Sequence, residues 1–185
     1  AMAEGRNAVH FCSRGVSAHA VGRLSLERDL WTALRHGELS LHYQPKVSVA
    51  SGRITGAEAL LRWEHPVRGM VPPDEFIPIA EQSDLIHALG DWVLRTAFAQ
   101  LARWQSDGLE GLGIAVNLAP AQINRPALCD RIADVLDETG ADATRVVLEI
   151  NENLFLKDPV AVARTLASMR ALGMRVAIDD FGTGH

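Results

Sequence analysis

Oxygen-bearing side chains recur along this chain at or beside the ends of short apolar runs. The first lies within a predicted strand and the other three at or next to the carboxyl ends of later ones: Glu58, Asn117, Glu149 and Asp179. On neighbouring parallel strands, three carboxylates and an amide oxygen would converge and repel one another unless a cation binds there. All-oxygen ligation suits Mg²⁺ or Mn²⁺, with Ca²⁺ as an inhibitory substitute.

Two further carboxylates extend this set. Glu152 follows Glu149 closely and Asp180 follows Asp179 directly, so both are placed to hold a second ion or the loop that comes next. Two divalent ions about 3.5–4 Å apart are a common means of activating water against a phosphodiester. A single carboxylate at a strand end is more often a helix cap or a turn former. The metal hypothesis therefore depends on the set and not on any one residue.

Glu58 taken alone allows two interpretations. It interrupts the apolar stretch Gly56–Trp63, and a buried charge needs a partner or a metal ion. Period-two geometry places Glu58, Leu60 and Arg62 on one face of the strand. Glu58 either forms a structural ion pair with Arg62 or faces a functional site, and the stretch itself leaves both open.

Length and composition bound the class of protein. The 185 residues suffice for one domain with a sizeable core, and 48% hydrophobic with 22% charged residues is typical of a soluble globular protein. A net charge of −5 gives no basic footprint, so no nucleic acid polymer is expected as a partner. Cys12 and Cys129 are isolated, which indicates a reducing cytoplasm. There is no apolar run of about 18 residues, so we expect no membrane contact by this segment; anchoring of the parent protein through another domain stays open.

Periodicity and turn residues predict an alternation of strands and helices. Residues 1–23 are interpreted as a tail and linker, after which Ser25 should cap a helix that ends at Gly37. An antiparallel hairpin should follow, with Pro45 limiting its first strand and Glu58 in its second. The later elements are predicted as helices near 74–81, 84–105, 126–139 and 158–173, and strands at 112–118, 145–150 and 174–180.

This alternation implies right-handed crossovers and a parallel sheet. An open doubly wound sheet and a (β/α) barrel both fit, and both carry their functional face at the carboxyl ends of the strands. A complete barrel has eight strands, whereas this sequence accounts for about five.

The motifs around the polar residues resemble the EAL domain family. They are Gln44-Pro45, Glu58-Ala59-Leu60, Pro73-Asp74-Glu75-Phe76-Ile77, Ala80-Glu81 and Asp179-Asp180-Phe181-Gly182-Thr183-Gly184. The family comprises metal-dependent phosphodiesterases that linearise cyclic di-GMP to pGpG. The resemblance implies an α/β fold of the (β/α)8 TIM-type barrel, incomplete here, with residues 24–185 as the N-terminal two-thirds of an EAL domain.

By position, the resemblance implies a role for each site residue. The metal ligands would be Glu58, Asn117, Glu149, Asp179 and Asp180. Catalysis would depend on Glu58, on Asp180 beside the nucleophilic water, and on Glu152, which would anchor the loop beginning at Phe181. Cyclic di-GMP would be contacted by Gln44, Leu60 and Arg62, with Arg62 on a phosphate. Ala119 and Asn151 depart from the family, which commonly has a serine and a threonine there.

The two ends of the sequence carry further expectations. Ala3-Glu4-Gly5-Arg6-Asn7 is similar to the close of GGDEF domains, which make cyclic di-GMP. This implies a tandem GGDEF–EAL parent, with residues 1–23 as the end of the GGDEF-like domain plus linker. The family's lysine, a further metal-binding glutamate and the last three strands have no counterpart before His185. We therefore expect these residues alone to be inactive, and an open sheet edge to favour a homo-oligomer.

Two functions from different classes follow. The parent is either a cyclic di-GMP phosphodiesterase in bacterial signalling or a degenerate EAL domain that binds the dinucleotide and regulates without cutting it. A pure sensor has no need of metal ligands, so the intact acidic set favours the enzyme.

Overall fold

The computed structural model describes residues 14–152, 154 and 158–179. Five strands form the path of one sheet, in the order β1-β2-β4-β5-β6, and a short strand, β3, pairs with β2. The strands are β1 (Leu39–Val47), β2 (Ile54–His65), β3 (Gly69–Val71), β4 (Gly113–Leu118), β5 (Val146–Asn151) and β6 (Arg175–Asp179). The helices are α1 (Arg14–His36), α2 (Pro73–Glu81), α3 (Leu85–Ser106), α4 (Pro120–Ile123), α5 (Leu128–Thr139) and α6 (Pro159–Ala171), with a 3₁₀ turn at Ala143–Arg145.

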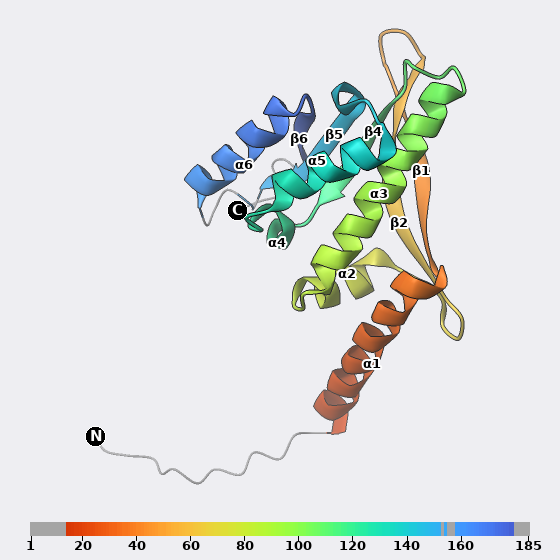
Figure 1. Cartoon of the computed structure of the whole chain (residues 1–185). Helices are drawn as coiled ribbons and strands as arrows, with labels where there is room; N and C mark the ends of the chain where they lie inside the picture. The colour runs from red at the N-terminus through yellow and green to blue at the C-terminus, as the bar shows by residue number, and fades with distance from the viewer. Residues whose placement is uncertain (1–13, 153, 155–157, 180–185) are drawn as a thin grey trace.

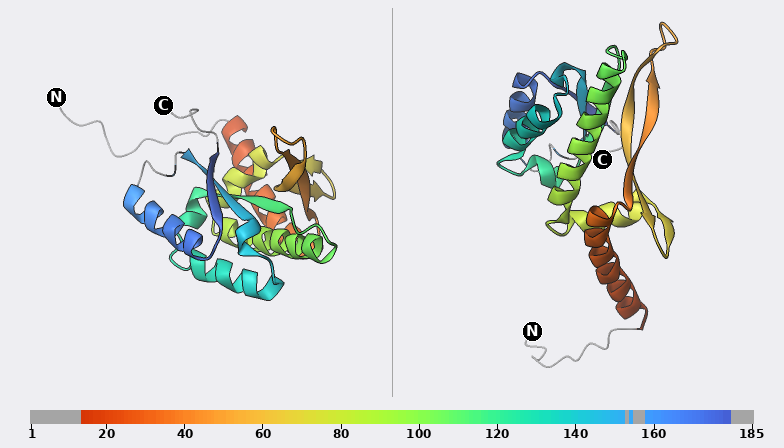
Figure 2. Two further views of the ribbon diagram at one scale, coloured as in Figure 1. Left: turned by 90° about the horizontal axis from the view of Figure 1, so that it is seen from above. Right: turned by 45° about the vertical axis from the view of Figure 1, so that its right-hand side comes forward.

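Strand order and direction decide between the two predicted architectures. β1 and β2 form the expected antiparallel hairpin, and β2, β4, β5 and β6 run parallel to one another. Their order follows the chain without the reversal that creates the switch point of a doubly wound sheet. Helices α3, α5 and α6 lie along one side of the curved sheet (Figures 1 and 2). This arrangement is that of a partial TIM-type barrel.

The main hydrophobic core lies between the sheet and these outer helices. Alternate strand residues point into it from β2, β4 and β5, against buried side chains of α3, α5 and α6. The central members are Ala59, Ile114, Val116, Leu148, Ile150, Leu94, Phe98, Leu101, Ile132, Val135 and Met169. Because side chains alternate along a strand, the residues between them face the other, concave side. The polar residues of interest lie on that side.

A second core joins α1 and α2 to the end of β2. Trp63 is fully buried and packs edge-on against Phe76, with ring centroids 5.5 Å apart. Leu26 and Leu30 of α1 belong to the same cluster. The indole nitrogen of Trp63 donates a hydrogen bond to Oε2 of Glu38 at 3.1 Å, which satisfies the polar atom of this buried ring.

The first helix corrects the predicted boundary. α1 begins at Arg14, not at Ser25, so the second half of the predicted linker is helical. Ser25 lies within the helix and its hydroxyl donates to Oδ2 of Asp29 at 3.2 Å. No proline interrupts residues 14–36, and the burial of Leu26, Leu30 and Ala33 in the C-terminal half of α1 lets the helix propagate toward its N-terminus at little cost. The predicted end at Gly37 is confirmed, with φ of 74°.

Two short elements were not expected. β3 is a three-residue strand before α2, and no strand was predicted there; the helix predicted near 74–81 is confirmed as α2, with Pro73 at its first position. α4 is a single turn directly after β4. The cap of α6 is confirmed, since the Asp158 carboxylate accepts a hydrogen bond from the Ala161 amide at 2.9 Å. Among the helices in the described part of the chain, none has the length and apolarity to cross a membrane.

Candidate functional site

Glu58 and Asn117 meet on the concave face of the sheet. Glu58 of β2 is the register partner of Ala115 in β4, so Asn117 lies two residues further along the neighbouring strand. Nδ2 of Asn117 donates a hydrogen bond to Oε1 of Glu58 at 2.8 Å. Arg62 instead donates to the carbonyl of Leu61 at 2.8 Å. Glu58 is therefore joined to the site and not to Arg62, which answers the question that the strand alone left open.

Glu149 is the most buried acid of this group. It is the register partner of Asn117 in the next parallel strand and only 7% exposed. The ammonium of Lys46 donates to Oε1 of Glu149 and forms an ion pair with it. Lys46 comes from β1, so this pair crosses the concave face above β2 and β4. A carboxylate at such low exposure requires a countercharge, and Lys46 supplies it.

The stagger of the four predicted ligands matches the geometry of a barrel. From β2 to β6, Asn117 lies two residues beyond the partner of Glu58, Glu149 is level with Asn117, and Asp179 lies two residues beyond the partner of Glu149. In an eight-stranded barrel, neighbouring tilted strands are staggered by about one residue, so side chains at one height must climb along successive strands. The four positions climb overall, by two residues from β2 to β4 and by two from β5 to β6, with no climb between β4 and β5.

These residues suit a divalent cation by their chemistry. The donors are carboxylate and amide oxygens, and the ammonium on Glu149 shows that positive charge is favoured there. In the conformation seen, the acids are held in separate pairs, Glu58 with Asn117 and Glu149 with Lys46. Accordingly, across the described residues no three His, Cys, Asp or Glu side chains stand close enough to hold one ion. Binding would require these pairs to rearrange.

The other predicted residues are placed as follows. Gln44 of β1 is the register partner of Glu58 and is exposed. Asp179 is exposed at the end of β6 and pairs in register with Asn151. Glu152 directly follows β5 and is half-buried. Asp180 and the Phe181-Gly182-Thr183-Gly184 segment lie outside the described residues.

A close approach of two glycines sets the spacing of β2 and β4. Gly56 and Gly113 are register partners, and a Cβ added to Gly56 would lie 2.4 Å from the carbonyl oxygen of Gly113. The second glycine is similarly confined, because its Cβ would lie 2.8 Å from the carbonyl oxygen of Arg145. Only hydrogen fits at these positions, so the two strands that carry Glu58 and Asn117 come closely together.

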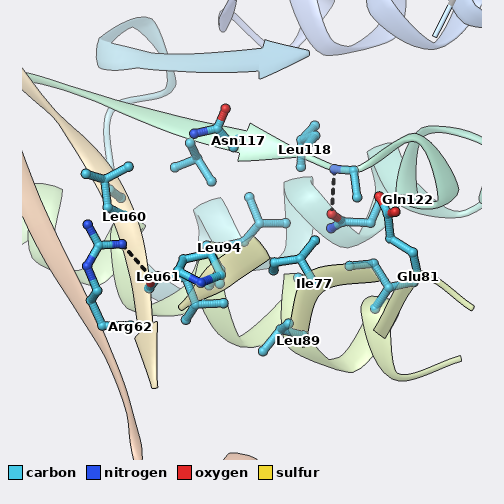
Figure 3. Close-up of a pocket in the computed structure, with 17 residues that line it drawn as sticks. Leu60, Leu61, Arg62, Ile77, Glu81, Leu89, Leu94, Asn117, Leu118 and Gln122 are labelled. Carbon is cyan, nitrogen blue, oxygen red and sulfur yellow. Dashed lines mark hydrogen bonds between the residues drawn. The ribbon is translucent and has the colours of Figure 1, made fainter. Parts of the chain in front are cut away.

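A mostly apolar cavity of about 260 Å³ opens beside this cluster (Figure 3). Leu60, Arg62 and Asn117 form part of its wall, together with Ile77 of α2 and Leu89 of α3. Leu60 and Arg62, both predicted to contact a ligand, thus share one cavity with the amide that bonds Glu58.

Two residues of the site were missed by sequence reasoning. Lys46 lies two residues after Gln44 in β1 and so on the same face of the strand, which could have indicated it. Its partner, Glu149, is three strands away. Gln122 of α4 lines the cavity and its Oε1 accepts a hydrogen bond from the Ala119 amide at 2.9 Å. Gly90 makes room for it, because a Cβ there would lie 1.9 Å from Nε2 of Gln122. No local pattern indicates that contact.

Fold and site together define a class of protein: a barrel-type α/β domain with acidic and amide side chains gathered near the carboxyl ends of its parallel strands, beside a cavity. Residues 27–185 match the EAL domain family, and the chain belongs to this family.

Individual relatives agree with this assignment. The chain is 46% identical over its whole length to a signalling protein of Caulobacter vibrioides, of which it covers 22%. Over 98% of its length it is 39% identical to the bifunctional diguanylate cyclase/cyclic di-GMP phosphodiesterase MucR of Pseudomonas aeruginosa, of which it covers 27%. The chain therefore spans about a quarter of the length of these relatives.

A solved structure confirms the fold. The PaMucR phosphodiesterase in complex with c-di-GMP superposes with a TM-score of 0.84 at 40% identity. The match covers 87% of this chain and 65% of that one. The predicted TIM-type barrel of the EAL family is thereby confirmed.

Proposed function

We propose that the protein hydrolyses cyclic di-GMP to linear pGpG with a divalent cation, Mg²⁺ or Mn²⁺. The observation that carries the proposal is the hydrogen-bonded contact of Glu58 with Asn117, with Glu149 level with that amide on the next strand. This is the donor chemistry that divalent cations require, placed next to a cavity that can hold a base. The relatives named as cyclic di-GMP phosphodiesterases support the choice of substrate.

Glu58, Asn117, Glu149 and Asp179 would hold the cation, with Asp180 completing the set. A bound divalent cation would supply the positive charge that polarises the phosphodiester and activates water. Glu58 and Asp180 would border the attacking water. Glu152, just after β5, would support the segment beyond Asp180.

The remaining residues would bind and orient the dinucleotide. Arg62 lines the cavity with a guanidinium that can form two parallel hydrogen bonds to a phosphate. Gln44, across from Glu58 in the hairpin, would donate its amide to the ligand from the other side. Leu60 would pack against a guanine base, whose flat apolar surface suits this cavity wall.

A turnover assay tests the proposal. The intact protein with Mn²⁺ should convert cyclic di-GMP to pGpG, resolved by chromatography, and Glu58→Ala should abolish the product. Asn117→Leu is a matched second variant that removes the amide bonded to Glu58, and it should also lose activity. If the wild type forms no more pGpG than Glu58→Ala, the proposal that the protein hydrolyses cyclic di-GMP is wrong.

The second candidate is a degenerate EAL domain that binds cyclic di-GMP without cutting it. The cavity beside Leu60 and Arg62 favours ligand binding whether or not hydrolysis follows. Saturable binding by calorimetry, with no pGpG formed, would identify this case. In either case the activity belongs to the whole domain, since the chain matches 65% of the solved PaMucR chain, and we do not expect these residues to turn over substrate alone.

The wider assembly is also part of the proposal. A GGDEF-like module before residue 24 would make the parent a tandem protein, which the name of the bifunctional relative MucR supports. A homo-oligomer would cover β6, whose only strand partner among the described residues is β5. Sedimentation of the intact protein tests the oligomer.

A further inference from the structure

The ion pair between Lys46 and Glu149 is built into the sheet. The side chain of Glu149 is 9% exposed and that of Lys46 is 42% exposed. The two residues lie on strands separated by β2 and β4, which would be about 14 Å apart in a flat sheet. The curl of the sheet brings their side chains together over the concave face.

The backbone around Lys46 aims its side chain at this contact. The register of β1 against β2 shifts between Lys46 and Val47, and such a bulge redirects neighbouring side chains. The hydroxyl of Thr55 donates to the carbonyl oxygen of Lys46 at 3.2 Å, which holds the backbone there. The placement of Lys46 therefore depends on strand geometry and not only on its own flexible chain.

The lysine occupies part of the proposed ligand set. Glu149 is the register partner of Asn117, and Asn117 bonds Glu58, so the ammonium lies within the cluster that would hold a divalent cation. An oxygen that accepts a hydrogen bond from Nζ is not free to coordinate a cation in the same direction. A unit positive charge beside a doubly charged ion also repels it strongly at the effective dielectric of such a site.

We propose that Lys46 is a positioning residue whose ammonium pairs with the Glu149 carboxylate in place of the divalent cation. The cation then binds only when the ammonium moves away from Glu149. This inference rests on the proposed function, because it assumes that Glu149 is a metal ligand. With no cation bound, Lys46 neutralises a buried carboxylate and stabilises the empty site. With a cation bound, the ammonium moves into water, which its partial exposure makes inexpensive.

The consequence is that Lys46 makes the site bind a divalent cation more weakly than the same carboxylates would without the lysine. Removing the charge should tighten the binding of Mn²⁺ by about tenfold, since one repelling charge and one competing hydrogen bond are lost. Removing it should also lower the melting temperature of the metal-free protein, because Glu149 then lacks its countercharge. A merely structural lysine would produce the second effect without the first.

The test compares Lys46→Met with Lys46→Arg in the intact protein. Free Mn²⁺ is followed by electron paramagnetic resonance during titration, a readout that needs no substrate and no turnover. Lys46→Met should bind Mn²⁺ about tenfold more tightly than the wild type, whereas Lys46→Arg, which keeps the charge, should bind within about twofold of it. Saturating Mn²⁺ should raise the melting temperature of Lys46→Met by more than that of the wild type. Lys46→Gln replaces the methionine variant if the latter does not fold, with the same expectation.

The outcomes separate this inference from the function beneath it. If the wild type binds Mn²⁺ and the neutral variant binds it equally or more weakly, the proposed competition between Lys46 and the cation is wrong, but the proposed metal site is supported. If neither the wild type nor the neutral variants bind Mn²⁺ at millimolar concentration, the proposed metal site fails and this inference fails with it. Tighter Mn²⁺ binding by the neutral variant, with Lys46→Arg binding as the wild type does, supports the inference.

Discussion

Gly56→Ala is the sharpest test of how the sheet positions the site. The added methyl group would lie 2.4 Å from the carbonyl oxygen of Gly113 and 2.9 Å from its carbonyl carbon. Both are backbone atoms of a neighbouring strand, so no side chain can turn away to relieve the contact. The strands β2 and β4 must move apart at this point, close to where they carry Glu58 and Asn117.

The magnitude follows from two opposing effects. Overpacking in a well-packed interior costs about 1–3 kcal/mol. Replacing glycine by alanine restricts the unfolded chain and returns up to about 1 kcal/mol, and the φ of Gly56 is not in the left-handed region, so alanine adds no backbone strain. The net loss should be about 1–2 kcal/mol, which corresponds to a melting temperature about 2–8 °C lower for a domain of this size.

Gly111→Ala is the matched control. Gly111 lies two residues before β4, and no atom lies within 4 Å of a Cβ built there. The same chemical change should therefore leave the melting temperature unchanged or slightly raised. The assay is thermal unfolding of both variants followed by circular dichroism, with Mn²⁺ affinity as a second readout that should fall only in Gly56→Ala. A Gly56→Ala protein as stable as Gly111→Ala would refute the packing argument.

Three further perturbations test other contacts. Gly90→Ala should displace Gln122 and break its hydrogen bond, which lowers the free energy of unfolding in urea by about 1 kcal/mol; an unchanged value would contradict the contact. The hydrogen bond from Arg95 lowers the pKa of Glu138 below its ordinary 4.5, so this stabilisation is complete above that value and is lost as the pH falls through the lower folded-state pKa. The stability advantage of the wild type over Glu138→Gln should thus shrink on acidification from about pH 6 to about pH 3, and a constant difference would be inconsistent with the shift. Trp63→Phe removes a 3.1 Å hydrogen bond to a carboxylate and should cost about 1.5–3 kcal/mol in thermal unfolding, with a loss under about 0.5 kcal/mol as the opposing result.

Local patterns predicted most of the elements because each depends on neighbouring residues. The alternation around Glu58 placed its side chain opposite the helix-facing Ala59, and Asp158 before Pro159 marked the start of α6. The start of α1 was missed because residues before Ser25 read as a linker, whereas helix packing downstream extends the helix to Arg14. α4 was missed because a single turn has no periodicity to detect.

In the candidate site too, some features could be predicted from local sequence and others could not. Its donor chemistry was visible in residue types at strand ends, and the family motifs named the same positions. The partners were not visible. That Asn117 bonds Glu58, and that Lys46 bonds Glu149, depends on strands far apart in the chain being brought into register.

The sequence by itself determined the alternation of helix and strand, the face on which each polar residue lies, and the oxygen donors available. It did so because side-chain parity, capping and donor chemistry are properties of a few adjacent residues. Only the tertiary structure decided that Lys46 of the first strand pairs with Glu149 three strands away. It alone also decided that Gly56 and Gly113 allow β2 and β4 to approach closely. Those contacts depend on the register and curl of the sheet, which arise from packing over the whole domain.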